Sequence, residues 1–262
     1  MHRKPLHAFM SFIFIFVSVS LACSTPQATP TPTSTNTTEP TATATITPTA
    51  TRTPRPTPTP RPTQTPNLAA TERAEELNAK VQDYFDKGYL TTTEGRFREL
   101  DDFSYDWAQL GWYRPFPIQD SVGDFILSAH FKWDSAFKNS DISGCGFIFG
   151  VQSNDDHYAV FLDRQKVFFL ITDNTVGFSR PVSPTRGNGI VKFDYPAEAD
   201  FTLIVKDAYA YVLVDGEVSA EYTLAQSRSA KGGIGLTVLS GTNKDYGTRC
   251  EMTNLQLWLP KE

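Results

Sequence analysis

The sequence predicts a mainly β protein, an antiparallel sandwich preceded by one short helix. Apolar side chains recur at every second position in residues 125–133, which is the period of a half-buried strand. The pair Asp215-Gly216 stands between two such alternating runs and is a strong hairpin signal. No helical period separates the runs, and many strands joined by turns without helices between them favour an antiparallel sandwich.

About ten or more strands are expected, and nine of them can be delimited from their alternation. In chain order they cover residues 125–133, 144–151, 157–164, 166–172, 201–206, 209–214, 217–222, 233–240 and 248–259. Several large aromatic side chains occupy the apolar positions of these runs and are predicted to form the core: Phe131, Trp133, Phe147, Phe149, Phe161 and Phe201.

One helix is predicted over residues 70–87. Its apolar positions recur at steps of three and four, and Lys87-Gly88 provides a C-terminal stop. We expect the helix to dock on the sandwich or to cap its entrance. A coiled-coil oligomerisation segment is the alternative, although the pattern lasts barely two heptads. The folded part is therefore divided into a helix and connector at 67–90 and a sandwich domain at 91–262.

The first 22 residues have the anatomy of a signal peptide. Arg3 and Lys4 precede an apolar run over residues 9–21, and this run is shorter than the roughly 20 residues that span a bilayer. Because the run ends in Ala22-Cys23, the N-terminus resembles a bacterial lipoprotein signal. In that family the cysteine thiol receives a diacylglycerol group, and the chain is cleaved just before it.

The resemblance implies that Cys23 is lipidated and that the protein is extracytoplasmic, anchored to the cell membrane. The family prefers Leu three residues before the cysteine and a small residue two before it, whereas this chain has Ser20 and Leu21. The alternative is a plain secretory signal cleaved near Ala22, which would leave Cys23 as an ordinary thiol.

Residues 23–66 are predicted to be a disordered tether. From residue 24 to residue 66, Thr and Pro make up 29 of 43 positions, and almost no apolar side chain is available to bury. A spacer biased towards polyproline II would reach on the order of 130 Å at ~3.1 Å per residue. It would carry the following domain away from the membrane.

Four stretches resemble parts of the concanavalin A-like jelly rolls. Residues 125–133 look like an early strand, 211–216 look like the recurrent strand–Asp/Asn-Gly–strand unit, and 232–236 followed by 250–257 look like the last two strands. The resemblance covers roughly residues 100–259 and implies this jelly-roll fold without specifying an activity. The nearest named relatives are laminin G-like and 3-keto-disaccharide hydrolase-like domains. The whole chain resembles Chloroflexi-type lipoproteins with a Thr/Pro tether and this sandwich.

Two cysteines remain once Cys23 is assigned to the lipid. The compartment implied by the signal is oxidising, and Cys145 and Cys250 allow a single pairing. We predict that they form a disulfide; the alternative is two buried free thiols. Zinc is not expected, because no second Cys or His stands at ligand spacing.

No catalytic residue, cofactor or metal site is predicted. The Glu-x-Asp-x-Glu strand pattern of jelly-roll glycosidases is absent, as are Gly-x-Ser-x-Gly, a phosphate loop and His-Glu-x-x-His. His157 and Asp163 share a strand face but lie about 20 Å apart at ~3.3 Å per residue. A calcium ion on Asp155, Asp156 or Asp163 would suit carboxylate chemistry but has no loop signature. Binding is therefore favoured over catalysis.

A sugar site requires an exposed aromatic platform with hydrogen-bonding neighbours. Trp112, Tyr158 and Tyr246 are the predicted ligand-binding residues, although each could equally be a packing residue.

The net charge is −5, and the first 66 residues carry five basic side chains against one acidic. The remainder is therefore strongly acidic, which argues against nucleic acid as a partner. The first hypothesis is a surface glycan-binding module. The alternatives are a carbohydrate-active hydrolase of the keto-disaccharide type and a structural or adhesion domain with a protein partner.

Overall fold

The computed structural model describes residues 68–140, 142–226 and 228–261. The predicted signal peptide at 1–22, the lipidated Cys23 and the tether at 23–66 lie outside these residues. The described part contains one helix, α1 (Leu68–Asp86), followed by fourteen strands. No helix within it has the length and apolar character needed to cross a membrane.

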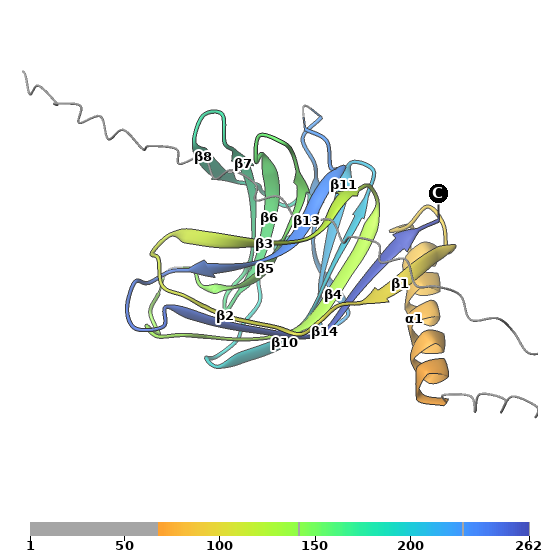
Figure 1. Cartoon of the computed structure of the whole chain (residues 1–262), viewed down its shortest axis with the longest axis horizontal. Helices are drawn as coiled ribbons and strands as arrows, with labels where there is room; N and C mark the ends of the chain where they lie inside the picture. Colours follow the sequence, from red (N-terminus) through yellow and green to blue (C-terminus); the bar gives the residue numbers. More distant parts are fainter. Residues whose placement is uncertain (1–67, 141, 227, 262) are drawn as a thin grey trace, which may run out of the picture. The chain divides into compact units, whose positions relative to one another are not determined.

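The strands form two antiparallel sheets (Figure 1). Sheet A contains, in spatial order, β1 (Gly95–Glu99), β14 (Thr248–Pro260), β4 (Phe125–Ser135), β10 (Ala197–Lys206), β11 (Tyr209–Val214), β12 (Glu217–Thr223) and β9 (Arg186–Gly187), and β2 (Phe103–Trp107) also pairs with β14. Sheet B contains β3 (Trp112–Val122), β13 (Gly232–Ser240), β5 (Gly144–Val151), β6 (His157–Asp163), β7 (Val167–Asp173) and β8 (Phe178–Pro181). The predicted mainly β antiparallel sandwich, preceded by one helix, is confirmed.

The main core lies between the two sheets. Phe131 and Phe201 from sheet A have ring centroids 4.9 Å apart, and Phe147 from sheet B lies 5.2 Å from Phe131. Such interdigitation is expected where alternate residues of both sheets point inward. The predicted core aromatics are all buried, but Phe161 belongs to a separate cluster on the outer face of sheet B.

Strand boundaries follow the alternation closely where strands are internal. The predicted runs at 144–151 and 209–214 coincide with β5 and β11, whereas β10 begins four residues earlier than expected. Strands β1, β2, β3, β8 and β9 were not delimited by the sequence. In β3 the prolines Pro115 and Pro117 argue against a strand, and they are tolerated because β3 is an edge strand of sheet B.

The helix α1 docks on the outer face of sheet A. Val81 and Tyr84 pack with Ile126, Ile204 and Trp258, which alternate with the residues of the main core. The predicted docking on the sandwich is confirmed, and α1 spans residues 68–86 where 70–87 was expected. The helix therefore begins before Glu72, Glu75 and Glu76, and its first turn contains no acidic residue.

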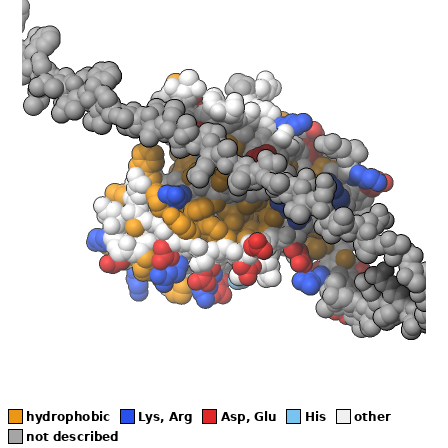
Figure 2. Space-filling view, viewed as in Figure 1, with side chains coloured by type: hydrophobic (Ala, Val, Ile, Leu, Met, Phe, Trp, Pro, Cys, Tyr) orange, Lys and Arg blue, Asp and Glu red, His pale blue; other side chains and the backbone are white. Residues whose placement is uncertain are grey.

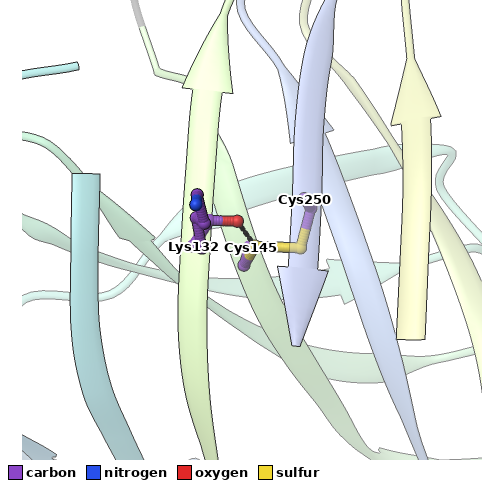
Figure 3. The surroundings of a disulfide bond; sticks show 3 residues. All are labelled: Lys132, Cys145 and Cys250. Atoms are coloured by element: carbon purple, nitrogen blue, oxygen red, sulfur yellow. Dashed lines mark hydrogen bonds between the residues drawn. A yellow bond between two sulfur atoms is a disulfide. The ribbon is translucent and has the colours of Figure 1, made fainter. Parts of the chain in front are cut away.

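The predicted disulfide joins the two sheets (Figure 3). Cys145 on β5 and Cys250 on β14 have Cα atoms 5.5 Å apart, and both side chains are fully buried. The disulfide prediction is confirmed, and the alternative of two free thiols is wrong.

Aromatic side chains from both sheets meet at the edge formed by β2 and β3. The ring centroid of Phe116 lies 4.6 Å from that of Tyr105 and 4.9 Å from that of Phe103, both in edge-on contact. The Arg114 guanidinium lies 5.5 Å from the ring centroid of Trp107. Figure 2 shows hydrophobic side chains gathered over this edge. The contacts hold the two edge strands together and so fix the position of β3.

Candidate functional site

A groove with a volume of about 1060 Å³ lies on the outer face of sheet B. Ile148, Leu170 and Thr172 line it, and they alternate along β5 and β7 with core residues such as Phe147 and Phe169. Because successive side chains of a strand point to opposite faces, the groove and the core share the same strands. The groove thus lies on a rigid framework.

The floor of the groove is apolar. A cluster of buried side chains on this face comprises Ile148, Ala159, Phe161, Leu170 and Leu239, with Tyr113 and Phe168 packed against it. Glycines leave room for this layer, since a Cβ at Gly146 would come 2.6 Å from the ring of Phe161. An apolar floor with few polar groups is the usual composition of a ligand pocket.

The Tyr113 side chain crosses the outer face of sheet B. Its hydroxyl lies 2.7 Å from His157 Nε2 on β6 and 2.7 Å from Thr172 Oγ1 on β7. In the sheet order, β13 and β5 lie between β3, which carries Tyr113, and β6, which carries His157. The Tyr113 side chain therefore reaches across β13 and β5. One side chain therefore connects the edge strand to the middle of the groove.

Four polar side chains form a continuous hydrogen-bonded row. His157 Nδ1 lies 2.6 Å from the backbone carbonyl oxygen of Asp155, which can only accept, so Nδ1 donates and Nε2 accepts from the Tyr113 hydroxyl. The Tyr113 oxygen then accepts from Thr172 Oγ1. Thr172 Oγ1 in turn accepts from Ser179 Oγ, which lies 2.8 Å away. The donor and the acceptor of each hydrogen bond in the row are thus fixed once His157 Nδ1 is known to carry the imidazole proton.

Burial keeps this row uncharged. Desolvation lowers the pKa of His157, and a smaller contribution from the nearby Arg228 lowers it further, against hydrogen bonding to Asp155. Desolvation likewise raises the pKa of Tyr113. At neutral pH both groups are therefore neutral, and the row offers hydrogen bonds without a formal charge.

Two exposed aromatic side chains belong to the groove lining. Trp112 on β3 is 63% exposed and Phe178 on β8 is 53% exposed, and these strands form opposite edges of sheet B. The indole N–H of Trp107 donates to the backbone carbonyl of Trp112 over 3.0 Å, which holds the chain at the exposed indole. Exposed aromatic faces of this kind can stack on an apolar ligand surface.

The predicted ligand-binding residues do not come together. Trp112 lines the groove. Tyr158 was expected to be accessible, which is wrong: it is 1% exposed and its hydroxyl accepts from the backbone N–H of Ala225. Tyr246 lies outside the groove lining. Its hydroxyl donates to Asp134 over 2.9 Å, and Arg249 lies 4.6 Å from its ring centroid.

The residues considered for acid–base or calcium chemistry are also apart. Asp163 is buried at the far end of β6 from His157 and accepts from the backbone N–H groups of Ser143 and Gln165. Asp156 accepts from Arg228 over 3.0 Å. Across residues 68–140, 142–226 and 228–261, no cluster of three or more His, Cys, Asp or Glu residues could hold a metal ion.

A second, more polar pocket of about 640 Å³ adjoins the groove and shares Asp173 and Phe178 with it. Arg228 is central to it, with ion pairs of 3.0 Å to Asp156 and 3.5 Å to Asp173. A hydrogen bond from the backbone N–H of Asn174 lowers the pKa of Asp156 more than the nearby Arg228 does. Arg228 thus carries one positive charge opposite the two carboxylates of Asp156 and Asp173.

Comparison with known proteins yields structural likeness only. No protein-family model and no curated protein matches the chain. The chain is similar to the carbohydrate-binding module CBM66 from Bacillus subtilis, at a TM-score of 0.45 and 11% identity over 61% of this chain and 94% of that one. It is also similar to a β-glucanase from Bacillus licheniformis, at a TM-score of 0.39 and 16% identity over 55% and 69% of the two chains. A fructosyltransferase from A. japonicus has a TM-score of 0.44 and 16% identity over 64% of this chain; only 27% of the enzyme is covered.

Sequence reasoning missed most of the groove. Thr172, Ser179 and Phe178 carried no motif, and His157 was considered only as a general base paired with Asp163. The run at β7 was a usable signal, because Phe168 and Leu170 alternate with core residues and make both faces of the strand apolar. The long reach of Tyr113 had no local signal.

Proposed function

We propose that the protein is an extracytoplasmic lipoprotein whose sandwich domain binds a glycan in the groove of sheet B. The basic and apolar segments before Cys23 support the anchor, and the Thr/Pro composition of residues 24–66 supports a tether. The groove supports the binding role. A hydrolase or a protein-binding domain remains the competing function.

The observation that carries the proposal is the combination of surfaces in one open groove. Trp112 and Phe178 present exposed rings, the floor is apolar, and the row from Ser179 to His157 is polar but neutral. Sugars have the matching chemistry, since their C–H faces stack on aromatic rings and their hydroxyls bond to neutral polar groups.

The test is glycan binding by the full chain purified in detergent, measured on a glycan array and then by calorimetry. Trp112→Ala is expected to weaken binding by roughly two- to tenfold, as for the loss of one aromatic contact. The control is Phe137→Ala, because Phe137 is also an exposed aromatic but lies in the β4–β5 loop, outside the groove lining. Equal affinities for the two variants would show that the ligand does not use the groove.

Two further readouts distinguish the competing functions. Release of reducing sugar from a bound glycan would favour the hydrolase. If the correctly folded protein neither binds nor cleaves any glycan, a protein partner is favoured. For the anchor, Cys23→Ala is expected to release the protein from washed membranes, whereas Ser24→Ala should leave it bound. If the Cys23 variant stays in the membrane, an uncleaved apolar segment is holding it.

A further inference from the structure

The described residues that line the groove include acidic side chains but no Lys or Arg. The acidic ones are Asp120, Asp155 and Asp173. Asp173 is paired with Arg228 at 3.5 Å. Within the part of the chain that the structure describes, Asp120 and Asp155 form no ion pair, and both are exposed. Two uncompensated carboxylates therefore face a ligand in the groove.

The three carboxylates lie at the same end of sheet B. Gln119, next to Asp120, pairs with Ile234 at the start of β13, and the neighbouring Gly233 pairs with Val151 at the end of β5. Asp155 follows in the β5–β6 loop, and Asp173 ends β7. The antiparallel register thus gives the groove an acidic end.

The polar row adds acceptors to this end and no free donors. The Tyr113 proton is directed to His157, the Thr172 proton to Tyr113 and the Ser179 proton to Thr172. Each of the three hydroxyl protons is therefore already used. The row itself leaves a ligand the lone pairs of its hydroxyl oxygens, beside the carboxylate oxygens. The donors of the lining are the side-chain amides of Gln119 and Asn174 and the indole N–H of Trp112.

We infer that the groove binds glycans rich in hydrogen-bond donors, prefers sugars with free amino groups over neutral ones, and binds uronate or sulfated glycans most weakly. This inference rests on the proposed glycan-binding function and names its ligand class. An ammonium group supplies three donors and a positive charge, which suit the acceptor-lined acidic end. A uronate supplies negative charge and acceptors, and so would lose water without gaining partners.

The expected preference is modest because the carboxylates are exposed. Exposed ion pairs contribute little to binding free energy, so removing one carboxylate should lower the affinity for an amino-sugar ligand by about two- to fivefold. Screening by salt should reduce the preference in the same way, since the Debye length is only ≈ 8 Å at physiological ionic strength. Binding of a neutral ligand should change little with salt.

The experiment compares three probes of equal length on the full chain in detergent: a glucosamine oligosaccharide, an N-acetylglucosamine oligosaccharide and a galacturonate oligosaccharide. The first two differ in charge at one position per sugar. Slightly acidic buffer keeps the amino groups protonated. We expect the glucosamine probe to bind more tightly than its acetylated counterpart, with the galacturonate probe weakest.

Asp155→Asn is the informative variant, and Asp245→Asn is its matched control. Both are exposed aspartates in loops with positive φ, +63° and +46°, and asparagine tolerates this conformation. The Asp155 carbonyl that accepts from His157 belongs to the backbone and is kept. Asp155→Asn should reduce the ratio of the affinities for the glucosamine and acetylated probes, whereas Asp245→Asn should leave this ratio unchanged.

The outcomes separate the two proposals. If Trp112→Ala weakens binding of some glycan but the galacturonate probe binds as well as the glucosamine probe, the charge preference is wrong and the groove function stands. If Asp155→Asn and Asp245→Asn reduce this ratio equally, the acidic end is not the cause and the inference fails. If no glycan of any charge binds, the proposed function itself fails.

Discussion

The disulfide between Cys145 and Cys250 should contribute a large share of the stability of the domain. It closes a loop with a sequence separation of 105 residues and joins the middle of sheet B to sheet A. On the loop-entropy model, a cross-link of this span restricts the unfolded chain by about 4–5 kcal/mol. Natural domains have unfolding free energies of about 5–15 kcal/mol, so opening the bridge should remove at least about a quarter of the total.

The measurement is guanidinium unfolding followed by tryptophan fluorescence, on the oxidised protein, the reduced protein and the Cys145→Ala/Cys250→Ala variant. The reduced protein keeps both sulfur atoms, so its decrease in unfolding free energy measures the contribution of the cross-link alone. The double variant also removes two buried groups and should lose slightly more. In both, the free energy of unfolding should fall more steeply with guanidinium concentration, because an unfolded chain without the cross-link exposes more surface. A loss under about 1 kcal/mol in the reduced protein would refute the reasoning from loop length.

Two other predictions concern the groove and a turn. Lowering the pH from about 7 to about 5 should destabilise the protein, because burial holds the pKa of His157 below its usual ≈ 6.5, so the unfolded chain binds more protons in that window. His157→Gln should flatten this dependence in urea titrations, and an equally steep fall in the variant would contradict it. Gly216→Ala should cost about 1 kcal/mol in thermal unfolding, since Gly216 has φ +81° and an added methyl group there would meet only open space. Gly123→Ala has the same open space without positive φ, and an equal loss there would exclude backbone conformation as the cause.

The internal strands could be predicted because their residues obey one local rule. In β5 and β11 every second side chain enters the core, and the Asp215-Gly216 turn has the positive φ values that such a tight hairpin requires. The edge strands could not be predicted in this way. β1 and β2 are five residues long and largely exposed, and β3 contains two prolines, so their position depends on pairing with β14 and β13.

The candidate site was harder to predict, because its geometry depends on the order of strands in the sheet. Trp112 could be identified as an aromatic in a polar context, but the contact between Tyr113 and His157 joins residues 44 positions apart. Tyr158 illustrates the opposite error. It shares β6 with His157, and the strand alternation that places His157 in the groove places Tyr158 in the core.

The layered fold separates the groups that stabilise the domain from the groups proposed to bind a ligand. The disulfide and the main core lie between the sheets, and α1 covers the outer face of sheet A, whereas Trp112 and Asp155 are exposed on sheet B. Substitutions at these two positions should therefore alter binding with little effect on stability, since they share no partners with the core. Tyr113 and His157 are different, because they cover the apolar floor as well as form the polar row. A loss of binding in a Tyr113 or His157 variant must accordingly be judged against its unfolding free energy, while a loss in a Trp112 or Asp155 variant can be attributed to the groove directly.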